Sequence, residues 1–161
     1  MTLGDSVPAG ANCSCPPFGD VYGALLTEHR GQPANVHNFG IDGQTSATLK
    51  AELSAGGSPE AQAIAGADIV TITVGANDFD ESLVDSPACA DLSCYHGDLA
   101  ALRGNLTAVI SAVRRLAPGR APTILVTGYW NVFLDGAVGA SHGSAYQHGS
   151  DRLTVAANLI I

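Results

Sequence analysis

The chain has 161 residues, of which 46% are hydrophobic and 14% charged, and its 19 glycines and 8 prolines follow no fixed period. This composition excludes a disordered, collagen-like or repetitive protein, and the length suits one domain over residues 1–161. Seven basic and fifteen acidic residues give a net charge of −8, which repels nucleic acid and anionic membranes. We therefore expect a neutral or cationic small-molecule ligand and no nucleic-acid partner.

Short β-branched runs alternate with amphipathic Ala- and Leu-rich segments, a pattern typical of parallel strands joined by helices. The predicted elements in chain order are a strand at Thr2-Leu3, a helix over Phe18–His29, a strand over Asn35–Asn38, helices over Ser46–Leu53 and Pro59–Ile64, a strand over Ala67–Val74, a helix over Leu99–Leu116, a strand over Thr123–Thr127, a loop from Gly128 to Gly149 and a helix over Ser150–Ile161. The fold class is α/β, a three-layer α/β/α sandwich with a parallel sheet.

Two of these elements carry further expectations. Ala67–Val74 has apolar residues for both faces of a buried strand. No apolar run in the sequence approaches the roughly 20 residues that a membrane span requires. The last helix, with Ser150 as its N-cap candidate, ends in Asn-Leu-Ile-Ile without a cap. The sequence therefore predicts no transmembrane segment, and a domain truncated at its C-terminus that lacks a final strand and helix.

The four cysteines form two close pairs, Cys13 with Cys15 and Cys89 with Cys94, in segments that resemble loops. Three connectivities are possible, and the short separations favour two local disulfides in a secreted, extracellular protein. A zinc site using Cys89, Cys94 and His96 is the alternative, but it lacks a fourth ligand and the usual spacing. We expect neither a metal nor a cofactor.

Residues that could take part in catalysis follow three of the predicted strands. Ser6 in Gly4-Asp5-Ser6 comes directly after the first strand, where a hydroxyl is placed to act as a nucleophile, although such a turn is also common by chance. Gly40 follows the second strand and offers a bare backbone N–H. Asn77 follows the third strand, and its side-chain amide could donate a hydrogen bond to an oxyanion. The alternative is that Asn77 is simply part of a turn, in which asparagine is common.

In their order and spacing these segments resemble the SGNH or GDSL hydrolases, which are serine esterases and lipases with a flavodoxin-like sandwich. The resemblance implies Ser6 as nucleophile, with the backbone N–H groups of Ser6 and Gly43 and the side-chain amide of Asn77 as the oxyanion hole. Similarity to secreted actinobacterial members lies in three further stretches, Val7–Gly10, Cys13–Phe18 and Gly128–Phe133.

The family's general base belongs to an Asp-x-x-His block, and the sequence contains none. Of the five histidines, His29, His37 and His96 fall in segments that do not suit the role, which leaves His142 and His148 as candidates. The expected function is hydrolysis of a small carboxylic ester or lipid, with Tyr129, Trp130 and Asn131 as substrate-binding residues. The alternative is a catalytically silent fragment or an ester-binding domain. The oligomeric state and the natural ester are left open.

Overall fold

The computed structural model describes residues 1–11, 13–134, 139 and 141–161. Within these residues the centre of the fold is a parallel sheet of four strands in the order β2-β1-β3-β4. The strands are β1 (Thr2–Gly4), β2 (Asn38–Gly40), β3 (Ile69–Thr73) and β4 (Thr123–Val126), and the α-helices are α1 (Ser6–Ala9), α2 (Phe18–Arg30), α3 (Ser46–Ala55), α4 (Pro59–Ile64), α5 (His96–Leu116) and α7 (Ser144–Asn158). The described residues also form the 3₁₀ turns η1 (Ala76–Asp78), η2 (Glu81–Leu83), η3 (Pro87–Cys89), η4 (Ser93–Tyr95) and η5 (Val132–Leu134).

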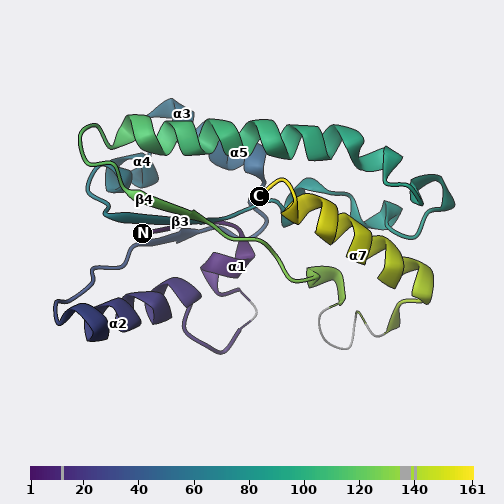
Figure 1. Cartoon of the computed structure of the whole chain (residues 1–161), viewed down its shortest axis with the longest axis horizontal. Helices are drawn as coiled ribbons and strands as arrows, with labels where there is room; N and C mark the ends of the chain where they lie inside the picture. The colour runs from purple at the N-terminus through teal and green to yellow at the C-terminus, as the bar shows by residue number, and fades with distance from the viewer. Residues whose placement is uncertain (12, 135–138, 140) are drawn as a thin grey trace.

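Helices cover both faces of the sheet. Figure 1 shows α3, α4 and α5 on one face and α2 on the other, with α1 and α7 towards the carboxyl ends of the strands. This arrangement confirms the predicted α/β fold with a parallel sheet.

The main hydrophobic core fills the space between the sheet and the layer formed by α3, α4 and α5. Val70 and Ile72 of β3 are fully buried there against Leu102 of α5. The opposite face of β3 carries Thr71 and Thr73, which are also buried. The same face also carries Ile69, so apolar residues lie on both faces of this strand, although threonine makes up most of the face towards α2.

Most element boundaries differ from the sequence prediction by a few residues; α5, for example, begins at His96 and not at Leu99. The differences at the second strand and at the last helix have structural consequences. The second strand begins at Asn38, not Asn35, because the parallel register pairs Thr2 with Asn38 and so leaves the preceding residues outside the ladder. The last helix begins at Ser144, inside the segment that was predicted to be a loop. Ser150 is consequently not an N-cap: it is a buried residue within α7 whose hydroxyl donates to the Gln147 carbonyl.

Both local disulfides are present, Cys13 with Cys15 and Cys89 with Cys94. The second bridge uses the thiols that a zinc site would need. No helix in the described part of the chain has the length and apolar character needed to cross a bilayer.

Candidate functional site

The turn that carries Ser6 is fixed by its two preceding residues. Gly4 has a φ of +127°, and a Cβ at this position would overlap the carbonyl of Thr73 on β3. Glycine alone fits such a position without strain. Asp5 is fully buried and caps α1, because its Oδ1 accepts the Val7 N–H at 3.0 Å. Ser6 is thus the half-buried first residue of α1, at the sheet edge where parallel α/β proteins bind ligands.

A chain of hydrogen bonds from the C-terminal part of the sequence supports this turn. The Tyr129 hydroxyl donates to Oδ2 of Asp5. The backbone of Tyr129 is held by Asn158 of α7, whose Oδ1 accepts the Tyr129 N–H at 2.9 Å and whose Nδ2 donates to the Tyr129 carbonyl at 2.8 Å. Burial raises the pKa of Asp5, the Tyr129 hydrogen bond opposes that rise, and the nearby charge of Asp78 adds to it. The pKa of Tyr129 is raised by burial and by Asp5.

Asn77 lies in η1, just after β3, and is tied to the loop that follows β2. Its Nδ2 donates to the Gln44 carbonyl at 3.0 Å, which places the amide beside the residue that follows Gly43. Gly40 does not offer the free N–H expected of it, because this group donates to Oδ1 of Asn38 at 2.9 Å. The N–H of Gly43, by contrast, donates to no group among the residues that the structure describes.

Asp78 also connects η1 to the loop that follows β2. Its Oδ1 accepts the backbone N–H of Ser46 at 2.8 Å, and burial raises the pKa of Asp78. The buried Ser46 hydroxyl in turn accepts from Asn105 of α5 at 2.9 Å, and Asn105 accepts from Lys50 at 2.6 Å. The loop that carries Gly43 is therefore anchored to η1, to α3 and to α5.

Ser6 and Asn77 line one cleft, with a volume of about 740 Å³. Among the described residues, neither the backbone N–H of Ser6 nor that of Gly43 donates a hydrogen bond, and no hydrogen bond engages the Ser6 hydroxyl. The rest of the cleft combines apolar, aromatic and acidic side chains: Val7, Ala76, Phe79, Glu81, Ser82, Asp85, Val132, Phe133, His142 and Tyr146.

The two histidine candidates lie in different environments. His142 lines the cleft that contains Ser6, and its ring stacks on Tyr146 with centroids 3.9 Å apart. His148 is an exposed residue of α7, not a loop residue, and is not part of the cleft wall. The remaining histidines lie in α2, before β2 and at the start of α5: His29, His37 and His96.

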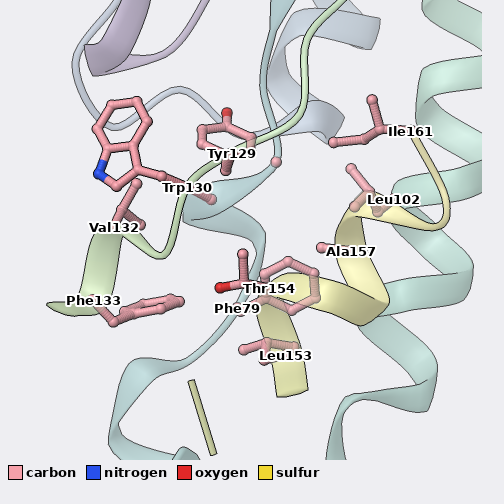
Figure 2. Close-up of a pocket in the computed structure, with 12 residues that line it drawn as sticks. Phe79, Leu102, Tyr129, Trp130, Val132, Phe133, Leu153, Thr154, Ala157 and Ile161 are labelled. Carbon is pink, nitrogen blue, oxygen red and sulfur yellow. The ribbon is translucent and has the colours of Figure 1, made fainter. Parts of the chain in front are cut away.

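The three predicted substrate-binding residues also separate. Tyr129 and Trp130 line a second, apolar pocket beside the cleft (Figure 2). The Asn131 amide instead donates to Ser150 at 3.0 Å and to Asp151 at 2.6 Å, which ties the segment after β4 to α7, and Asn131 lines neither cavity.

Residues 2–153 match the model of the GDSL-like lipase/acylhydrolase family. The chain belongs to this family. By family this GDSL hydrolase is a serine ester hydrolase, and its ligand is a small-molecule ester. A comparison with curated protein sequences found no match.

Solved SGNH-type structures share the fold of this GDSL hydrolase. The lipase Lip_vut3 from a goat rumen metagenome is 17% identical, with 94% of this chain and 73% of that chain covered and a TM-score of 0.65. AlinE4, an esterase of the SGNH-hydrolase family, is 20% identical over 94% of this chain and 69% of that one, with a TM-score of 0.55. Axe2, an acetylxylan esterase from Geobacillus stearothermophilus, is 20% identical over 99% of this chain and 69% of that one, with a TM-score of 0.53.

Sequence reasoning missed the residues that hold the site together. Nothing in the local sequence marks Tyr129 as a partner of Asp5, since the two are 124 positions apart and meet only in the fold. Asn158 sits near the end of an amphipathic helix and carries no motif. Asp78 belongs to Gly75-Ala76-Asn77-Asp78, so its proximity to Asn77 was the one signal available.

Proposed function

We propose that this chain hydrolyses carboxylic esters with Ser6 as the nucleophile. Ser6 Oγ attacks the acyl carbonyl, the alcohol leaves with a proton, and water then releases the acid and restores the Ser6 hydroxyl. The observation that carries the proposal is that Ser6 and Asn77, which come from two different strand ends, line the same cleft.

The oxyanion would be held by the backbone N–H groups of Ser6 and Gly43 and by the amide of Asn77. Neither backbone N–H donates to any part of the chain that the structure describes, and the hydrogen bond of Asn77 to Gln44 fixes one N–H of the amide while leaving the other for a ligand. Fixed donors aimed at developing charge are worth about 10²–10³ in rate each. The anchoring of Gly43 and Asn77 through Asp78 supports a preformed hole, because it restricts both segments.

His142 is our proposed proton acceptor within this chain, since it lines the cleft with Ser6 and His148 does not. General-base catalysis contributes about 10²–10⁴-fold. Without a base the serine stays protonated, and the chain would be the catalytically silent ester-binding domain instead.

The test compares p-nitrophenyl acetate and butyrate hydrolysis by the wild type and by Ser6→Ala, with Ser111→Ala on the exposed side of α5 as the matched control. We expect Ser6→Ala to fall to the buffer rate and Ser111→Ala to retain the wild-type rate. Equal rates for wild type and Ser6→Ala would contradict the proposed hydrolysis and support the alternative, a catalytically silent ester-binding domain.

A second pair of variants tests the base. His142→Ala should lower kcat by about 10²–10⁴-fold, whereas His148→Ala should not change it. If both variants keep the activity of a hydrolytic wild type, the proton acceptor is not a histidine of this pair.

We also propose an extracellular location. Two short-range disulfides suit an oxidising compartment, since cytosolic thiols are kept reduced.

A further inference from the structure

The second pocket lies against the catalytic cleft and is lined by apolar surface. It is lined by residues after β3 and after β4, by η5, by α5 and by the C-terminal part of the chain from α7 onwards. Figure 2 shows Trp130 and Phe133 on one side of it and Leu102 and Ala157 on the other, with Phe79 between them. A cavity with this lining favours a hydrocarbon group over a polar one, because it offers a polar group almost no hydrogen-bond partner.

The pocket and the cleft share four wall residues: Ala76, Phe79, Val132 and Phe133. Ala76 directly precedes Asn77, so the pocket opens beside the place where the ester carbonyl would be held. The carbonyl carbon carries both the acyl chain and the alcohol oxygen, and only the acyl chain stays on the enzyme after the alcohol has left. The position of the pocket therefore fits the acyl side of the substrate.

The size of the pocket limits that chain. Its free volume is about 20 Å³, and by the same measure a single water needs about 10–15 Å³. Burying each CH₂ is favourable, but a chain of five or more carbons beyond the carbonyl has no room without displacing Phe133 or Leu153. The tight fit opposes long acyl chains.

We propose that the pocket between η5 and α7 binds the acyl chain of the substrate and restricts this hydrolase to short acyl groups. This inference rests on the proposed ester hydrolysis at Ser6.

The first experiment measures kcat/KM for p-nitrophenyl acetate, propionate, butyrate, hexanoate and octanoate. We expect the maximum at acetate or propionate and at least a tenfold lower value at hexanoate. Ala157→Val, which fills the pocket, should lower the propionate-to-acetate ratio. Phe133→Leu, which enlarges the pocket, should move the maximum to a longer chain. Val155→Ala is the control, because Val155 is 60% exposed on the same helix and lines neither cavity.

The second experiment reports on the pocket without turnover. Trp130 is the chain's single tryptophan and lines the pocket, so its fluorescence reports occupancy. Ser6→Ala protein titrated with ethyl propionate should show a saturable change in emission, which Ala157→Val should weaken and Val155→Ala should preserve. Ethyl octanoate should bind more weakly than ethyl propionate.

The two proposals fail in different ways. A saturable change in fluorescence with no hydrolysis by the wild type would support binding of the acyl chain in the pocket and contradict the proposed hydrolysis at Ser6. Hydrolysis with equal rates from acetate to octanoate would contradict the acyl-binding role of the pocket but would be consistent with ester hydrolysis at Ser6. A rate that depends on the length of the alcohol in a series of acetates, and not on the acyl length, would also overturn it.

Discussion

Asp5 is the residue on which the geometry of the nucleophile depends. It is a buried carboxylate held by two donors, the Val7 N–H and the Tyr129 hydroxyl, and none of its hydrogen bonds comes from a lysine or arginine in the described chain. A buried anion without such partners is costly, which is why the pKa of Asp5 is raised. The phenol of Tyr129 therefore stabilises the ionised form of the side chain that caps α1.

Tyr129→Phe removes this donor and should raise the pKa of Asp5 further. A folded-state pKa above the unfolded value means that stability is lost as pH rises from the unfolded pKa through the folded one. We expect the variant to be less stable by about 1–3 kcal/mol at pH 7, with a difference that shrinks as the pH is lowered and Asp5 becomes protonated in both proteins. Urea unfolding of the wild type and of Tyr129→Phe at several pH values measures this difference in the free energy of unfolding. Tyr22→Phe on α2 is the control, and a loss in Tyr129→Phe that does not vary with pH would contradict the argument.

At the scale of elements, α7 shows where tertiary contacts override local preference. Gly149 and Ser150 look like a loop end and a helix cap, yet both are buried inside a continuous helix. A Cβ at position 149 would overlap the carbonyl oxygen of Val84, so the glycine is there to let α7 approach the segment after η2 closely. The sequence alone could not indicate this, because Val84 is distant along the chain.

Glycine-to-alanine changes in two helices test this explanation. In an exposed helix interior, alanine is favoured over glycine by about 0.5–1 kcal/mol. Gly104→Ala in α5, with open space around the new methyl, should raise the free energy of unfolding by that amount. Gly149→Ala should instead lower it, by about 1–3 kcal/mol, because of overpacking against Val84. Chemical denaturation of both variants decides the matter, and a stabilising Gly149→Ala would show that α7 is free to move away.

For the whole molecule, patterns that repeat along the chain were predictable and contacts between distant segments were not. The bounds of α4 and the end of α5 follow from their sequence periods and breakers, and β3 and β4 follow from their β-branched runs. The beginning of β2 depends on register with β1, which no local pattern encodes. At the site, Ser6 and Asn77 could be expected to approach because parallel strands end at one edge, whereas the bonds of Asp5 to Tyr129 and of Asp78 to Ser46 depend on the packed fold.

The net charge of −8 should affect which esters the cleft accepts. Glu81 and Asp85 line the wall, and none of the described residues in that wall is a lysine or arginine. A unit charge about 8 Å from one carboxylate in a largely aqueous cleft interacts by about 0.5–1 kcal/mol, or about two- to fivefold in binding. Aromatic rings such as Phe133 and Tyr146 add attraction for an alkylammonium group.

We therefore expect acetylcholine to be hydrolysed with a higher kcat/KM than its uncharged isostere 3,3-dimethylbutyl acetate, by about two- to fivefold per carboxylate at low salt. An ester of an anionic alcohol should be slower than the isostere. The preference should shrink as ionic strength rises, because salt screens exposed charges. Glu81→Gln and Asp85→Asn should each reduce it, while Asp20→Asn, on the remote helix α2, should not. An unchanged ratio in the Glu81→Gln, Asp85→Asn double variant would show that the attraction comes from the aromatic rings and not from the carboxylates.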